Sequence, residues 1–229
     1  IAPPSKALIV GPTYSEYERE VTMDGGRCHY FSLTEDSSFR LDVPALTEEL
    51  SHNVDLLILC NPNNPTSSVI PRNQMRDILD YCKKKSITVL VDETYVEFAP
   101  DVQAVTAIPL TEYYNNIIIL RGISKFFAAP GLRLGYAICG NKDLLKEINQ
   151  KKNPWTINSL AAIAGEIMFS DEEYIRKTRQ LIASERERIC QAIRSMGAYQ
   201  VYESNCNFVL VKIKKEGLTA DQIFDTAIR

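Results

Sequence analysis

The sequence of 229 residues lacks the features of several protein classes. It contains no apolar run long enough to cross a bilayer, so no membrane partner is expected. Lys and Arg total 26 against 29 Asp and Glu, giving a net charge of −3. Without a basic excess, nucleic acid is not expected as a partner. Hydrophobic residues at 45% and charged residues at 24% are ordinary for a globular chain and exclude wholesale disorder.

Paired cysteines and clustered histidines are also missing. The six cysteines are scattered without a CxxC pair, and the two histidines, His29 and His52, do not cluster with them. This spacing favours buried, reduced thiols in a cytoplasmic protein over a disulfide framework or a zinc site, and no metal is expected. Residues 1–10 also lack the basic-then-apolar order of a signal peptide.

Buried-strand patterns alternate with helical patterns along the first 140 residues. The expected strands are residues 6–10, 27–32, 54–60, 87–91, 117–120 and 132–139, and the expected helices are 14–23, 44–51 and 71–85. The run VDLLILC at 54–60 is typical of a parallel strand that is covered on both faces. This order predicts an α/β fold with a mostly parallel sheet.

The pattern changes after residue 140. Helices are expected at 142–152, 158–169 and 171–196, followed by strands at 199–202 and 207–212. The helix at 158–169 is rich in small apolar residues and is predicted to be buried. We place a domain boundary near residue 165, which gives a large domain at 1–165 and part of a small α+β domain at 166–229 that begins with a long helix.

Four unusual segments lie at the ends of the expected strands. They are NPNNPT at 61–66, DETY at 92–95, Ser124-Lys125, and PGLR at 130–133. Ligands of a parallel sheet bind beyond the carboxyl ends of its strands. An acid, a tyrosine, a lysine and an arginine are therefore expected to converge on one cleft.

Each of these residues also has a simpler interpretation. Asn64 fits a turn, Asp92 fits a helix N-cap, and Tyr95 fits a core aromatic residue with a satisfied hydroxyl. Lys125 and Arg133 fit ordinary surface charges. Their coincidence at successive strand ends favours a functional site.

These motifs resemble the signature set of class I/II aminotransferases, which depend on pyridoxal 5'-phosphate (PLP) and have fold type I. The residues that carry the resemblance are NPNNPT, VDETY, SK and, eight residues after the lysine, GLR. GPTYSEYE, VDETYVEFAP and SNCNFVLVKI are similar to histidinol-phosphate aminotransferases. KFFAAPGLRLGY and NPWTINSLAAIAGE look closer to threonine-phosphate decarboxylases. The resemblance covers essentially the whole chain and implies the three-layer large domain of PLP-transferases.

The resemblance implies the catalytic residues of this chain. Lys125 forms the Schiff base with the cofactor aldehyde and then moves protons at the substrate α-carbon. Asp92 faces the pyridine nitrogen and keeps it protonated. Asn64 and Tyr95 hydrogen-bond the ring hydroxyl oxygen and tune the imine.

The resemblance also implies how the rest of the cofactor is held. Arg133 pairs with the phosphate through its planar fork, Ser124 adds a hydroxyl to the same phosphate, and Tyr14 stacks on the ring. Two positions depart from the family pattern. Thr94 replaces an alanine on the ring face, and Gly122 stands where relatives often carry a phosphate-binding threonine.

The family pattern further implies parts that do not occur within these 229 residues. Family members begin with a substrate-covering arm and a small-residue loop that cradles the phosphate at a helix N-terminus, and both would precede Ile1. More small domain, with an arginine for the substrate carboxylate, would follow Arg229. We therefore expect an incomplete enzyme whose whole form is a homodimer with sites at the subunit boundary.

Several functions stay open. The favoured one is an aminotransferase acting on a phosphorylated amine such as histidinol phosphate. The second is a decarboxylase of threonine phosphate in corrinoid side-chain synthesis. A non-catalytic, aminotransferase-like sensor domain would need an attached DNA-binding segment. A nicotinamide-dependent dehydrogenase would need GxGxxG after the first strand, which Gly11-Pro12-Thr13 does not supply.

Overall fold

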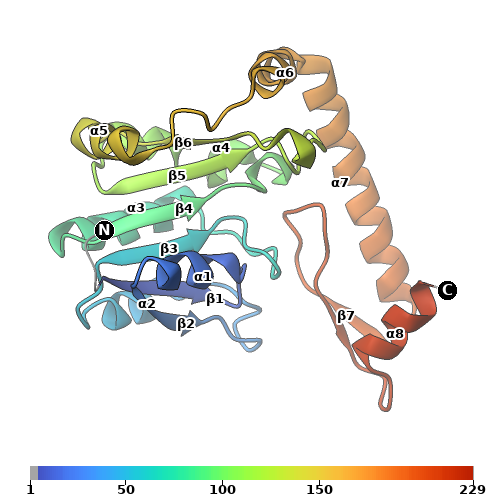
Figure 1. Ribbon diagram of the computed structural model, residues 1–229. Helices are drawn as coiled ribbons and strands as arrows, with labels where there is room; N and C mark the ends of the chain where they lie inside the picture. Colours follow the sequence, from blue (N-terminus) through green and yellow to red (C-terminus); the bar gives the residue numbers. More distant parts are fainter. Residues whose placement is uncertain (1–4, 229) are drawn as a thin grey trace.

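A computed structural model describes residues 5–228 and contains a six-stranded sheet in the order β2-β1-β3-β4-β5-β6 (Figure 1). The strands are β1 (Lys6–Gly11), β2 (Arg27–Ser32), β3 (Leu56–Cys60), β4 (Thr88–Asp92), β5 (Ile117–Gly122) and β6 (Gly135–Ile138). Strands β1 to β5 run parallel to one another, and β6 runs antiparallel to β5. The expected α/β fold with a mostly parallel sheet is confirmed.

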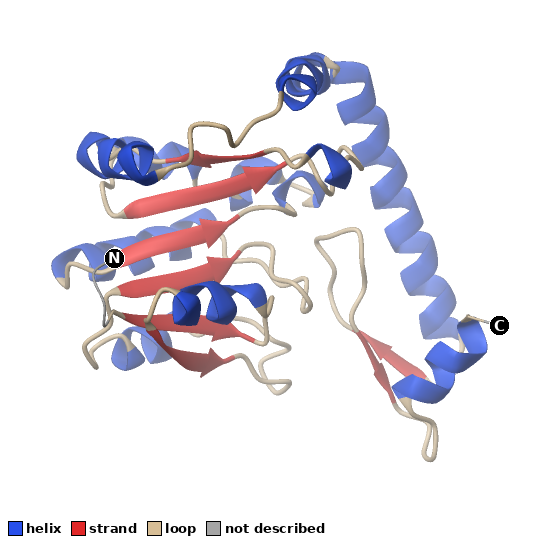
Figure 2. Cartoon of the chain, viewed as in Figure 1, coloured by secondary structure: helices blue, strands red, loops and turns tan. Residues whose placement is uncertain are grey.

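Helices cover both faces of this sheet, as Figure 2 shows. In chain order they are α1 (Glu16–Met23), α2 (Val43–Glu49), α3 (Arg72–Lys84), α4 (Val102–Val105) and α5 (Lys142–Lys151), with short 3-10 turns η1 (Val96–Phe98), η2 (Ile108–Glu112) and η3 (Pro130–Leu132). Helix α1 lies on the near face in Figure 1, and α3 lies on the far face. Helix α3 buries Met75, Ile78, Leu79 and Cys82, whose spacing of three or four places them on one side of the helix.

Strand alternation divides the core between the two faces. Leu57 and Leu59 of β3 join the larger cluster with α2 and α3, whereas Leu56 and Ile58 join the smaller cluster under α1. Every residue of β3 is buried, because neighbouring side chains point to opposite faces and both faces are covered. The unbroken apolar run in the sequence follows from this double cover.

The C-terminal third runs past the carboxyl ends of the parallel strands (Figure 1). Its elements are α6 (Ser159–Ser170), α7 (Glu172–Ser195), β7 (Tyr199–Val201), β8 (Val211–Ile213) and α8 (Ala220–Ala227). The Asp171 side chain caps α7 by accepting from the Tyr174 backbone N–H, and Gly197 follows the helix with a φ of +68°. Strands β7 and β8 form an antiparallel ribbon.

Helix α6 differs from its expected burial. Leu160, Ile163 and Ile167 are 73%, 58% and 64% exposed, and only Ala161 and Gly165 of this helix are buried. The small residues allow close packing, since a Cβ at Gly165 would lie 2.8 Å from the Leu134 side chain. No other segment of residues 5–228 covers the larger apolar residues. The expectation of a buried helix is therefore wrong for the described chain.

The domain boundary near residue 165 falls inside α6 and stays a prediction. Between residues 5 and 228, none of the helices combines the length and the apolar character needed to cross a membrane.

Candidate active site

Four parallel strands end at one edge of the sheet. Cys60 of β3 pairs with Asp92 of β4, which in turn pairs with Leu120 of β5. The segments that follow β1, β3, β4 and β5 therefore emerge together at the right-hand edge in Figure 1. This arrangement brings the sequence-predicted polar segments to one side of the molecule.

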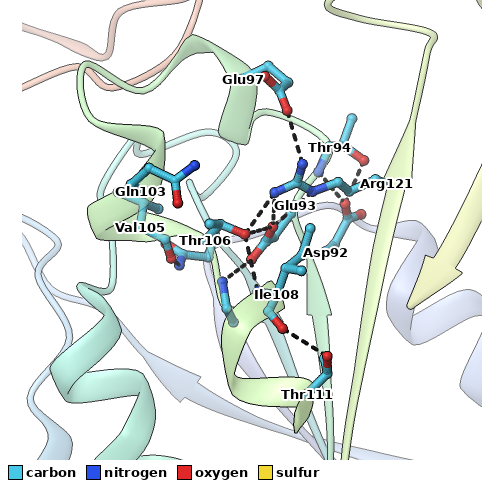
Figure 3. Close-up of polar contacts among 12 residues, drawn as sticks. Asp92, Glu93, Thr94, Glu97, Gln103, Val105, Thr106, Ile108, Thr111 and Arg121 are labelled. Atoms are coloured by element: carbon cyan, nitrogen blue, oxygen red, sulfur yellow. Dashed lines mark hydrogen bonds and ion pairs between the residues drawn. The ribbon is translucent and has the colours of Figure 1, made fainter. Parts of the chain in front are cut away.

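Asp92, the last residue of β4, accepts hydrogen bonds from three donors. The Tyr17 hydroxyl donates to Oδ2 at 2.7 Å. The Thr94 backbone N–H and hydroxyl donate to Oδ1 at 2.9 and 2.5 Å (Figure 3). A carboxylate has about four lone-pair sites, so about one acceptor position is left for a further donor.

Tyr17 is a site residue that the sequence reasoning missed. Burial raises the pKa of its hydroxyl, and the nearby Cys60 and Asp92 raise it further, so the hydroxyl stays protonated and serves as a donor. The sequence signal that could have found Tyr17 is its spacing on the expected helix, because Tyr17 and Val21 are four residues apart and share one side. In the structure, both residues pack on the smaller apolar cluster.

The NPNNPT loop is fixed against the segment that follows β1. The Asn63 amide donates to the Pro12 carbonyl at 2.9 Å and to the Thr66 hydroxyl at 2.8 Å, and it accepts from the Thr13 hydroxyl at 2.9 Å. Asn64 is partly buried and precedes Pro65 through a cis peptide bond. The three contacts of Asn63 hold the loop in which Asn64 lies.

Tyr95 and Tyr14 lie near the Asp92 carboxylate. Burial raises the pKa of Tyr95, and the charges of Cys60, Cys206, Asp92 and Tyr14 contribute in the same direction. The Tyr95 ring packs edge-on against Phe208, with ring centroids 5.1 Å apart. Tyr14 is 50% exposed, and its ring forms a T-shaped pair with the Tyr17 ring.

The cationic residues are separate from this hydrogen-bonded group. Lys125 is exposed, and residues 5–228 offer it no ion-pair partner. Arg133 is exposed and adopts the left-handed conformation at φ +54°, and its Nη1 donates to the Pro130 carbonyl at 3.0 Å. Ser124 is partly buried one residue before the lysine. Neither cation is committed to another side chain, so both are available to an anionic or carbonyl ligand.

These residues fit a phosphorylated pyridine aldehyde. Asp92 could supply one acceptor for a protonated ring nitrogen, Lys125 an amine for the aldehyde, and Arg133 a planar fork for the phosphate. The described residues contain no group of three or more His, Cys, Asp or Glu that could hold a metal ion. Thr94, the departure on the ring face, acts as a hydrogen-bond donor to Asp92.

Comparison with known proteins finds relatives that agree with the resemblance seen in the sequence. Residues 1–228 match the family model of class I and II aminotransferases. A Caldanaerobacter subterraneus subsp. tengcongensis protein, provisionally named a threonine-phosphate decarboxylase, is 35% identical over 98% of this chain and 60% of its own length. The histidinol-phosphate aminotransferase of Clostridium novyi is 34% identical over 90% of this chain and 55% of its own length.

A solved structure has the same fold. The histidinol-phosphate aminotransferase of Clostridium acetobutylicum superimposes with a TM-score of 0.91 at 30% identity, covering 98% of this chain and 66% of that one. The chain spans about 60% of the length of the curated relatives that it matches. The family match extends over residues 1–228 and agrees with the motifs at the strand ends. The chain therefore belongs to the PLP-dependent class I and II aminotransferase family.

Proposed function

We propose that this chain is the cofactor-binding part of a PLP-dependent aminotransferase that acts on a phosphorylated amine of the histidinol-phosphate type. The observation that carries the proposal concerns Asp92, the last residue of β4. Its carboxylate has about one acceptor position left, and it lies at the same end of the parallel strands as Lys125. The named aminotransferase relatives at 34% and 30% identity support the same activity.

Asp92 and Lys125 are the residues that this chain brings to the proposed reaction. When bound, PLP supplies a conjugated ring that withdraws electrons from the substrate α-carbon. Asp92 holds a proton on the ring nitrogen, and its hydrogen bonds from Tyr17 and Thr94 fix the direction of the carboxylate. The Lys125 amine attaches the cofactor and afterwards carries protons to and from the α-carbon.

The remaining residues position the cofactor. Asn64 and Tyr95 hydrogen-bond the ring hydroxyl oxygen, and Tyr14 packs on the ring face with its accessible side. Arg133 and Ser124 bind the phosphate, where the guanidinium supplies paired donors and the charge. These roles rest on the family motif and on the placement of the residues at one sheet edge.

A decarboxylase of threonine phosphate is the second candidate. Its support is specific, because the relative provisionally named for that activity is 35% identical over 98% of this chain. Both reactions use the same cofactor contacts. They differ in which bond at the substrate α-carbon breaks, and that choice depends on how the substrate carboxylate is held.

One experiment separates the candidates. The longest natural form of the protein, loaded with PLP, is given histidinol phosphate with 2-oxoglutarate, or threonine phosphate alone. Glutamate formed in the first reaction supports the aminotransferase, and carbon dioxide released in the second supports the decarboxylase. Attachment of PLP to Lys125 without either product favours the sensor domain. A Lys125→Ala variant is the control and should lose both products.

We further propose that the whole protein is a cytoplasmic homodimer. The family resemblance supports the dimer, as do the exposed apolar residues Leu160, Ile163 and Ile167 on α6. The six free cysteines support a reducing compartment. Sedimentation analysis of the longest natural form tests the dimer, since a monomer at micromolar concentration contradicts it.

A further inference from the structure

A buried ion-pair cluster lies at the ends of β4 and β5. The Arg121 side chain is 11% exposed and the Glu93 side chain is fully buried. Arg121 donates to Glu93 Oε2 through Nη2 at 2.7 Å and through Nε at 3.0 Å (Figure 3). It also donates to the Thr106 hydroxyl at 2.7 Å and to Glu97 Oε1 at 3.0 Å. One arginine therefore joins three separate segments of the chain.

The buried carboxylate is fully engaged. Glu93 accepts from the Ala107 backbone N–H at 2.6 Å and from the Thr106 hydroxyl at 2.8 Å, in addition to Arg121. Burial by itself lowers the pKa of Arg121, but the Glu93 and Glu97 carboxylates outweigh it and raise that pKa overall. The guanidinium therefore stays charged in the interior, where it keeps its contacts with Glu93, Glu97 and Thr106.

The cluster lies directly behind the proposed cofactor site. Neighbouring residues of a strand point to opposite faces, so Asp92 points toward α1 and Glu93 points toward the segment between α4 and η2. The Glu93 backbone N–H also donates to the Leu120 carbonyl at 2.8 Å. Lys125 follows Arg121 by four residues. The ends of β4 and β5 therefore carry the ion pair on one face of the sheet, while Asp92 lies on the other face.

We propose that Arg121 and Glu93 are positioning residues for the cofactor site, which act from the opposite face of the sheet. Their ion pair fixes the end of β4 relative to the end of β5, and so fixes the Asp92 carboxylate relative to the turn that carries Lys125. The guanidinium fork is required because it binds Glu93, Glu97 and Thr106 at once, which a lysine ammonium on a flexible stem does not reproduce. This inference rests on the proposed function.

The decisive variants change the pair with little change in volume. Glu93→Gln keeps an oxygen for the backbone N–H of Ala107 but removes the charge that holds Arg121. Arg121→Lys keeps the charge but removes the fork. Arg188→Gln is the matched control, because Arg188 pairs with Glu185 on the exposed surface of α7, at 66% and 43% exposure.

The readouts separate positioning from structural support. We measure the unfolding midpoint of the cofactor-free protein, the dissociation constant of PLP, and the pH midpoint of the visible band of Lys125-bound cofactor. Turnover is then measured as kcat and KM. For both variants we expect a folded protein with PLP affinity about tenfold weaker, a displaced pH midpoint, and kcat reduced about 10–100-fold with little change in KM. Arg188→Gln should match the wild type in every measurement.

The outcomes are distinguishable. If folded Glu93→Gln and Arg121→Lys keep the wild-type PLP affinity, pH midpoint and kcat, the positioning role is refuted while the proposed function stands. If neither variant folds, the pair has a structural role and the inference is overturned. If the wild type itself does not attach PLP at Lys125, the proposed function fails before the variants are compared.

Discussion

Asp92→Asn is the substitution that most directly tests the proposed cofactor site. The change preserves the shape of the side chain and removes its charge. The amide oxygen still accepts from Thr94, and the Tyr17 hydroxyl can turn to accept from the new amide N–H. The hydrogen bonds of the carboxylate are therefore kept in number, and what is lost is the negative charge that is proposed to face the ring nitrogen.

The expected loss of stability is moderate. Hydrogen bonds to a charged group contribute about 1.5–3 kcal/mol, against about 0.5–1.5 kcal/mol for neutral pairs. Each of the three bonds is weakened by about 1 kcal/mol, so the free energy of unfolding of the cofactor-free protein should fall by about 3 kcal/mol. For a chain of this size, each kcal/mol lowers the melting temperature by about 2–4 °C.

Turnover should fall as well. If Asp92 contributes one charge-assisted hydrogen bond to the ring nitrogen, its loss raises the barrier by about 1.5–3 kcal/mol, or about 10–150-fold in rate. Initial rates at saturating PLP measure this, and borohydride reduction followed by mass spectrometry should still find the cofactor on Lys125. Thr94→Ala is the control: it removes a neutral donor and leaves the charge, so turnover should change only about 2–5-fold.

Two results would refute the reasoning. Wild-type turnover in Asp92→Asn would remove Asp92 from the catalytic residues. A loss of more than about 4 kcal/mol in the free energy of unfolding would show that the carboxylate is mainly structural, since losses of that size indicate a broken buried network.

Three further predictions concern other parts of the molecule. Tyr14→Ala should weaken PLP binding by about 3–10-fold, given about 0.5–1.5 kcal/mol for an aromatic contact, and unchanged affinity in a fluorescence titration would exclude ring stacking. Lys212 and Tyr202 lower the pKa of Glu35 below 4.5, so this contact stabilises the fold at neutral pH and is lost as the pH falls through the lowered value. Glu35→Gln should therefore flatten the fall in melting temperature below pH 4.5, and an identical acid profile would contradict this. Iodoacetamide at pH 8 should label the two partly exposed thiols before any buried one, as peptide mass spectrometry would show; the partly exposed cysteines are Cys28 and Cys139, and the buried ones are Cys60, Cys82, Cys190 and Cys206.

The sheet could be predicted from the sequence because its signals are local. The apolar run at 54–60 and the proline before α3 define β3 and the start of a helix without any knowledge of the rest of the chain. The long helix α7 was also expected, from its acidic start and from Gly197 at its end. The mostly parallel direction of the strands followed from the alternation of strands and helices, whereas the strand order and the antiparallel β6 come from the structure alone.

The burial of α6 could not be predicted in the same way. Small apolar residues such as Ala161 and Gly165 indicate close packing on one side only. Whether Leu160, Ile163 and Ile167 are covered depends on which other segments are present, and within residues 5–228 none covers them. The composition of a helix indicates whether it can pack closely. The exposure of its side chains depends on which other segments surround the helix.

The candidate site shows the same limit at the scale of single residues. Asp92 stood out because it begins a recognisable motif, whereas its neighbour Glu93 was passed over, although the structure buries it completely. The partner of Glu93 is Arg121, 28 residues away, and only the register of β4 with β5 brings the two together. Tyr17 likewise reaches Asp92 across 75 residues. A motif therefore identifies the residues that meet a ligand, while the residues that orient them depend on tertiary contacts that no local pattern contains.

The consequence for the chemistry is that the direction of the Asp92 carboxylate is set from two sides of the sheet, by a hydroxyl on its own face and by a buried ion pair behind it.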